Sequence, residues 1–175
     1  MAVLNTRGVH HITLNGADKQ TSMDFWEGVL GMPFVFEQPN LDNPTLNHLY
    51  FDPGDGRLIT IFTDENRVAG DHKSGEVPGS AHHLAFDVDE ATITSAAARL
   101  REAGYKVAER DRGFMNSLYF REPLGHMIEL ACYKMEAPEG VSWGEILKKA
   151  YELRMARGVA AIETEDLKAA IDALS

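Results

Sequence analysis

The alternation of apolar and polar positions predicts the same order of elements twice along the chain. In the first half, a strand-like run over 9–14 comes before helical spacing over 18–30, which ends at Gly31. In the second half, a similar run over 81–86 comes before helical spacing over 90–102. The pattern therefore indicates an internal duplication, which has to be recognised before the fold can be assigned.

Three more strands complete each half, and a turn that contains Pro and Gly separates the last two of them, at 52–56 and at 122–125. The expected strands cover 34–37, 46–51, 57–62, 106–109, 117–121 and 126–133. One such unit cannot bury both its helix stripe and its sheet face alone. We therefore expect an α+β fold in which two βαβββ modules, 8–63 and 80–133, combine into an incomplete barrel.

The C-terminal part of the sequence departs from this repeat. Ser142 is expected to cap a helix, with Glu145 at the capping-box position, and apolar residues recur at helical spacing to about Arg157. Thr164 is expected to cap a last helix. This helical tail over 137–175 either covers a sheet edge or meets a second subunit, and the pattern leaves both open.

Composition narrows the class of protein. With 175 residues, 44% of them hydrophobic and 25% charged, the chain is expected to be one soluble globular domain, 1–175. A net charge of −10 argues against nucleic acid as a partner, because phosphate binding needs clustered Lys and Arg. No apolar stretch approaches the roughly 20 residues that span a bilayer. The single cysteine, Cys132, fits a reducing compartment, so we expect a cytoplasmic protein.

Two histidine pairs, His10-His11 and His82-His83, open the first strand of each half and contain four of the seven histidines. The last strand of the second half carries one carboxylate, Glu129. Two imidazoles and one carboxylate are the ligand set of a mononuclear non-haem Fe(II) site with open coordination positions. The sequence therefore predicts a metal enzyme.

Strand geometry favours one histidine of each pair as the ligand, because neighbours on a regular strand point to opposite faces. His11 and His83 are favoured, since they occupy matching positions of the repeat; the other histidine of each pair reaches the site if the strand begins there. The first-half counterpart of Glu129 is Thr60, so only the second half supplies a carboxylate. Three protein ligands leave positions for a chelating substrate and O2.

The duplicated unit resembles the vicinal oxygen chelate superfamily over about 8–133. The order of a Tyr, an acidic-Pro-x-Gly turn and a Glu over 119–129 is similar to that of extradiol ring-cleaving dioxygenases. The His-His-Ile-Thr opening, the His-Leu-Tyr-Phe strand at 48–51 and the second paired-histidine strand resemble the hydroquinone-cleaving branch. Those enzymes carry two copies of the paired module, whereas this chain has one. The catechol branch expects a histidine before the Tyr, where 110–112 read Arg-Asp-Arg here.

The resemblance implies an Fe(II)-dependent ring-cleaving dioxygenase, with Mn(II) as the other metal that accepts these ligands. Its substrates would be O2 and a hydroquinone or a catechol-like aromatic. The implied metal ligands are His11, His83 and Glu129. The residues implied to act around the metal are His10, Thr13, His82, Arg112 and Tyr119. Paired modules of this kind often close their sites across two subunits, so we expect a homodimer.

The implied roles follow from ordinary catalytic chemistry. His10 or His82 would act as acid and base toward the substrate hydroxyl, while Tyr119 and Arg112 would hydrogen-bond to the developing oxyanion. Each residue also has a structural interpretation: Tyr119 as an aromatic on a half-buried strand, and Arg112 as the ion-pair partner of a neighbouring acidic residue. His48 is expected to be structural.

Two alternatives remain for the function. One is a metal-dependent glyoxalase-like isomerase or lyase, or a thiol transferase, of the same superfamily; Thr60, which stands where a first-half carboxylate would be, counts against it. The other is a non-enzymatic drug-binding resistance protein, which needs no metal triad. Activity without O2 would favour the first alternative, and failure to retain metal would favour the second.

Overall fold

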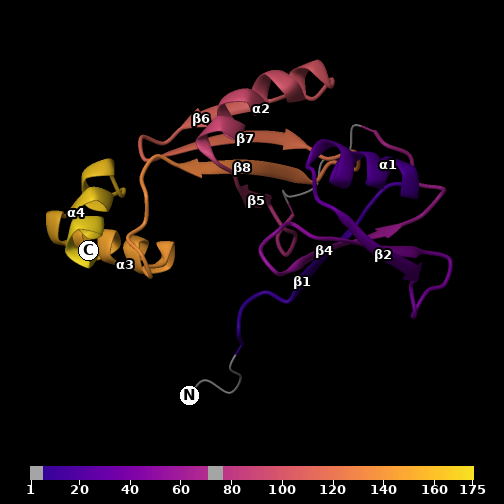
Figure 1. Ribbon diagram of the computed structural model, residues 1–175, viewed down its shortest axis with the longest axis horizontal. Helices are drawn as coiled ribbons and strands as arrows, with labels where there is room; N and C mark the ends of the chain where they lie inside the picture. Colours follow the sequence, from indigo (N-terminus) through magenta and orange to yellow (C-terminus); the bar gives the residue numbers. More distant parts are fainter. Residues whose placement is uncertain (1–5, 71–76) are drawn as a thin grey trace. The chain divides into compact units, whose positions relative to one another are not determined.

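The computed structural model describes residues 6–70 and 77–175, and Figure 1 shows its helices and strands. The chain forms two compact units. The first unit comprises 1–84 together with the turn 121–127, and the second unit comprises 85–120 together with 128–175. None of the helices in the described part of the chain has the length and apolar character that crossing a bilayer requires.

The first module has the predicted strand–helix–three-strand order. Its elements are β1 (His11–Asn15), α1 (Lys19–Met23), η1 (Asp24–Val29), β2 (Phe34–Pro39), β3 (Asn47–Phe51) and β4 (Leu58–Thr63). The strands lie in the order β1-β4-β3-β2, with β1 parallel to β4 and the other pairs antiparallel. The predicted helix over 18–30 is α-helical only in its first part, because η1 continues it as a π-helix.

The second module repeats this order. Its elements are β5 (Leu84–Asp87), α2 (Glu90–Glu102), β6 (Ala108–Asp111), β7 (Met115–Arg121) and β8 (Met127–Tyr133). The strand order β5-β8-β7-β6 is equivalent to that of the first sheet. The α+β class and the two βαβββ modules are therefore confirmed. Their combination into one incomplete barrel stays a prediction.

The two faces of the first sheet differ in character. One face is apolar and packs against η1: Trp26 is buried, with its ring 6.4 Å from that of Phe51, and Ile61 is fully buried. Side chains alternate between the two faces along each strand, so the register places those that point away from η1 together on the opposite face. We call this second surface the histidine face; its members include His11, Thr13, Phe36, His48, Tyr50, Thr60 and Phe62.

Gly16 allows the close approach between the end of β1 and β4. A Cβ at this position would collide with Cγ2 of Ile61 and lie 2.9 Å from the hydroxyl of Ser22. We expect Gly16→Ala to lower the free energy of unfolding by about 1–3 kcal/mol, as overpacking does in well-filled cores. Gly28→Ala is the matched control, since nothing lies within 4 Å of a Cβ there. Equal urea midpoints for the two variants would contradict this packing.

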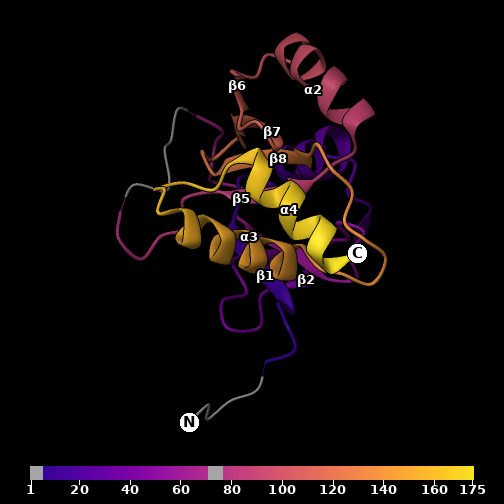
Figure 2. The ribbon, with the colours of Figure 1, turned by 90° about the vertical axis from the view of Figure 1, so that its left-hand side faces the viewer.

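The tail forms a helical hairpin of α3 (Trp143–Arg157) and α4 (Thr164–Leu174), which lie side by side in Figures 1 and 2. The capping box of Ser142 and Glu145 is confirmed. The prediction for Thr164 was wrong by one residue, because the N-cap of α4 is Glu163.

This hairpin has its own apolar core. Its fully buried members are Ile146, Ala150, Leu167 and Ala170. Phe114, from the turn between β6 and β7, packs against that core, and Tyr133 stacks on Trp143 with ring centroids 3.5 Å apart. The tail is thus anchored to the end of the second sheet within the second unit.

Candidate metal centre

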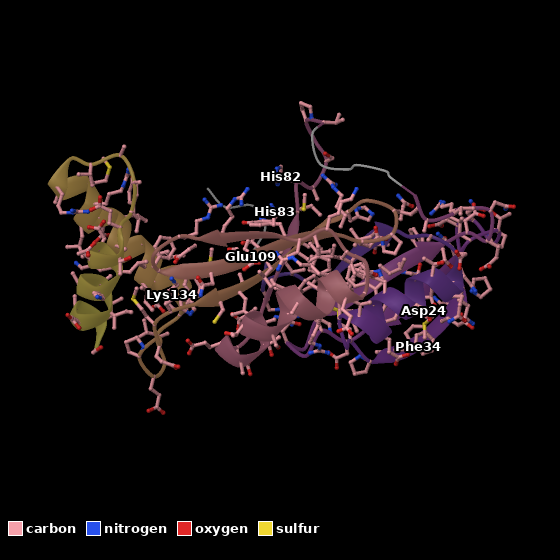
Figure 3. The ribbon with its side chains drawn as sticks, turned by 90° about the horizontal axis from the view of Figure 1, so that it is seen from above. Asp24, Phe34, His82, His83, Glu109 and Lys134 are labelled. Atoms are coloured by element: carbon pink, nitrogen blue, oxygen red, sulfur yellow. The ribbon has the colours of Figure 1, made fainter. Side chains whose placement is uncertain are left out.

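The two histidine pairs have the same side-chain geometry. Nδ1 of His10 lies 2.8 Å from Nδ1 of His11, and the rings meet edge to face with centroids 5.1 Å apart. His82 and His83, labelled in Figure 3 on the segment before β5, have the same two distances. The duplication therefore extends beyond the backbone to the arrangement of the paired imidazoles.

The expected alternation of faces does not apply to these pairs. β1 begins at His11 and β5 begins at Leu84, so His10 and both histidines of the second pair precede their strands. Away from the pleated ladder, adjacent side chains are free to turn toward each other. Both members of each pair consequently remain available to a site at the start of these strands.

The contact between the paired rings restricts their protons. Of two Nδ1 atoms 2.8 Å apart, one must carry a hydrogen and donate it while the other accepts. A metal-bound histidine usually donates its second ring N–H to a neighbour, which fixes its orientation. If His11 and His83 donate from Nδ1 to their neighbours, Nε2 of each keeps a lone pair for a metal. The pairs fit the predicted ligand role.

The predicted carboxylate ligand, Glu129, accepts a hydrogen bond from Tyr119, which the sequence also placed near the metal. Glu129, on β8, is only 4% exposed, and the hydroxyl of Tyr119, on β7, donates to its Oε1 at 2.7 Å. A buried carboxylate is costly unless it is hydrogen-bonded or bound to a cation. This pair belongs entirely to the second unit, and its chemistry fits a metal ligand with an orienting neighbour.

The equivalent place in the first sheet holds a pair of hydroxyls. Thr60 lies opposite Thr13 on β1 and opposite Tyr50 on β3, and its hydroxyl donates to that of Thr13 at 2.8 Å. Thr60 is fully buried. The first half therefore carries no carboxylate at this level of its sheet.

Arg112 is exposed in the turn between β6 and β7, where its backbone N–H donates to the carbonyl of Met115. The neighbouring carboxylates form ion pairs with other residues: Glu109 with Arg101 at 2.5 Å and Asp111 with Lys134 at 2.7 Å. The hydrogen bond and charge of Lys134 also lower the pKa of Asp111. A role of Arg112 toward a substrate oxyanion stays a prediction.

His48 and Glu122 are two polar groups whose environment the sequence did not reveal. The Tyr50 hydroxyl lies 2.9 Å from Nδ1 of His48, and burial and then the charge of His11 lower the pKa of His48. Glu122 is buried in the turn before β8, and burial raises its pKa. Its Oε2 accepts the backbone N–H groups of Leu124 and His126, so it shapes the turn. The acidic-Pro-x-Gly spacing over 122–125 predicted the turn, but not that the buried carboxylate accepts the N–H groups within it.

The predicted ligands are distributed over both units. His11 and His83 belong to the first unit, and Glu129 belongs to the second. Within residues 6–70 and 77–175, no group of three or more His, Cys, Asp or Glu side chains is gathered in a way that could hold a metal ion. The structure brings together each histidine pair, Thr13 with Thr60, and Tyr119 with Glu129. The metal triad itself stays a prediction.

Relatives of this chain include two kinds of enzyme. It is 28% identical over 154 residues to MhqE of Bacillus subtilis, named as a ring-cleaving dioxygenase, which covers 82% of this chain and 49% of that protein. It is 26% identical to the glutathione transferase FosA of Serratia marcescens, over 71% of this chain and 79% of that one. The chain thus spans about half the length of the dioxygenase relative.

A solved structure supports the fold at this size. A glyoxalase/dioxygenase from Nostoc punctiforme is 28% identical, with a TM-score of 0.62, and the match covers 77% of this chain and 97% of that one. Residues 8–130 match the sequence family described as the Glyoxalase/Bleomycin resistance protein/Dioxygenase superfamily. These residues contain both histidine pairs, Tyr119 and Glu129. The chain belongs to the glyoxalase/bleomycin resistance protein/dioxygenase superfamily.

Proposed function

We propose that the chain is an Fe(II)-dependent dioxygenase that opens an aromatic ring beside a hydroxyl group, on a hydroquinone or a catechol-like substrate. The observation that carries the proposal is the matched geometry of the two histidine pairs, each with Nδ1 atoms 2.8 Å apart. The hydrogen bond from Tyr119 to the buried Glu129 supports it, and so does the similarity to MhqE.

His11, His83 and Glu129 would hold the metal, which when bound supplies Lewis acidity toward a phenol oxygen and a route for electrons to O2. Mn(II) accepts the same ligands. Tyr119 fixes the orientation of the Glu129 carboxylate through its hydroxyl. This orientation matters because a ligand held in place needs no rearrangement when the substrate arrives.

His10 and His82 are the proposed acid–base groups. Because Nδ1 of each would accept the hydrogen of its neighbour, the neutral ring would carry its own hydrogen on Nε2, from which it would donate to a substrate oxygen and to which the proton would later return. The Thr13 hydroxyl accepts from Thr60 and so keeps its own hydrogen to donate. Arg112 would stabilise the oxyanion that develops during ring opening.

The test is oxygen consumption by protein loaded anaerobically with Fe(II). We expect O2 uptake with a hydroquinone or a catechol, together with loss of the aromatic absorbance and incorporation of both atoms of ¹⁸O2 into the ring-opened product. Metal-free protein is the control. No uptake with any hydroquinone, catechol or homogentisate-like phenol would contradict the proposal.

A metal-dependent thiol transferase is the second candidate. The observation that favours it is length: the match covers 79% of FosA but only 49% of MhqE. Such a reaction consumes a thiol and needs no O2. The test is whether metal-loaded protein joins glutathione to an electrophilic substrate under nitrogen. If it does so, and consumes no O2 with phenols, the chain is a thiol transferase and not a dioxygenase.

A further inference from the structure

The end of β1 carries an Asn-Gly pair, Asn15-Gly16, the dipeptide in which asparagine deamidates most readily. Deamidation begins when the backbone nitrogen of the next residue attacks the side-chain carboxamide, and glycine, which has no Cβ, hinders this attack least. The Asn15 side chain is exposed and makes no hydrogen bond with any residue of the described ranges. The carboxamide is therefore accessible to water, and the backbone decides whether it reacts.

The packing of β1 requires glycine after this asparagine. A Cβ on Gly16 would collide with Cγ2 of Ile61 and lie 2.9 Å from the hydroxyl of Ser22. A bulkier residue after Asn15 would slow deamidation, but its side chain would overpack this contact. The close approach of β1 to β4 thus keeps a chemically labile pair in the chain.

The peptide group between the two residues is held from both sides. The N–H of Gly16 donates to the carbonyl of Phe62, on β4, at 2.9 Å. On the opposite side, Nε2 of His126 lies 3.0 Å from the carbonyl of Asn15 and must donate to it, because a carbonyl only accepts. His126 and both strands belong to the same compact unit. The attacking nitrogen is therefore occupied, and a peptide that turned toward the carboxamide would lose both hydrogen bonds.

Arg67 strengthens this arrangement. Its Nη1 donates to the carbonyl of Gly16 at 3.2 Å and to that of Phe62 at 3.1 Å. Gly16 is itself buried. Buried, hydrogen-bonded backbone opens less often than exposed loops and chain ends. Attack by the Gly16 nitrogen consequently has to wait for a local opening of the sheet.

We propose that Asn15 is a latent deamidation site, which the fold protects and which reacts when the end of β1 separates from β4. In the opened chain the nitrogen of Gly16 bonds to Cγ of Asn15, the bond from Cγ to Nδ2 breaks, and ammonia leaves with the amide proton of Gly16. Water then opens the cyclic imide at either carbonyl, which gives aspartate or isoaspartate. The reaction consumes only water, so it is independent of the proposed function.

Isoaspartate makes the opening irreversible. It adds one methylene group to the backbone before Gly16, which disturbs the alternation of a regular strand. The close contact of Gly16 with Ile61 and its hydrogen bond to Phe62 cannot then both be restored. A transient separation of β1 from β4 thereby leaves a permanent chemical change in the chain.

The first experiment compares folded protein with protein unfolded in guanidinium chloride, both at mildly alkaline pH. Proteolysis and mass spectrometry measure the fraction of Asn15 converted to aspartate and isoaspartate, and Asn15→Gln, whose longer side chain forms such a ring slowly, is the control. We expect ready conversion in the unfolded chain and at least about 10-fold slower conversion in the folded chain, because only the small opened population reacts. Equal rates in the two states, or no conversion in the unfolded chain, would overturn the proposal.

The second experiment tests whether local opening is sufficient. His126→Ala removes one donor to this peptide group, so it should raise the rate in folded protein about 5-fold, the effect of one neutral hydrogen bond, and leave the rate in guanidinium chloride unchanged. Ile146→Val is the matched control, because it loosens the core of the helical tail in the other compact unit, and it should leave the rate at Asn15 unchanged. Equal acceleration in both variants, or none in His126→Ala, would contradict protection by the local hydrogen bonds.

Discussion

His83→Ala is expected to abolish retention of the metal ion. The variant removes one of the three proposed ligands, and the other two, His11 and Glu129, lie on different strands. We expect anaerobically loaded wild-type protein to keep about one Fe(II) per chain through gel filtration, and the variant to keep essentially none. O2 consumption should disappear with the metal.

A matched variant separates this effect from general damage. His126→Gln removes an imidazole whose Nε2 lies 3.0 Å from the carbonyl of Asn15, and it should retain the metal. Circular dichroism should show both variants folded, because the His83 side chain is exposed. A folded His83→Ala protein with full metal content would remove His83 from the ligand set.

Tyr119→Phe is expected to keep the metal site but to weaken it. The phenol hydroxyl donates to Oε1 of Glu129 at 2.7 Å, and its loss leaves a buried carboxylate with one hydrogen bond fewer. Neighbours that orient metal ligands typically contribute 10- to 100-fold in metal affinity or activity, so we expect a loss of about that size. Competition with a chelator measures the affinity, and oxygen uptake measures turnover.

The duplication supplies the control for this prediction. Tyr50 occupies the same place in the first half, but its hydroxyl contacts His48 and no predicted ligand. Tyr50→Phe should therefore leave metal affinity unchanged. Equal losses of affinity in the two variants would show that Tyr119 acts through packing of its strand and not through the carboxylate.

The repeat was predictable from the sequence because hydrophobic periodicity records which face of each element is buried. The predicted helix over 90–102 coincides with α2, and the pairing of Tyr119 with Glu129 follows from adjacent strands joined by a short turn. Periodicity does not distinguish α from π hydrogen bonding, however. The backbone N–H of Leu30 donates to the carbonyl of Phe25, five residues earlier, as in a π-helix. No residue in this segment indicated a π-helix from the sequence.

Other features depend on contacts that a linear pattern does not contain. The approach of His10 to His11 requires knowing that β1 begins only at His11, and strand ends are poorly fixed by hydrophobicity. His48 was expected to be structural, since its contact with Tyr50 and its buried Nε2 appear only in the folded sheet. The anchoring of the tail by Phe114 is likewise a tertiary contact.

The most direct measurement is a crystal structure of the protein loaded with Mn(II), a redox-stable substitute, under nitrogen. The account predicts one ion per chain, bound by one ring nitrogen each of His11 and His83 and by the carboxylate of Glu129, with the remaining positions open to water. An ion held by other side chains, or these three side chains directed away from a common centre, would contradict it.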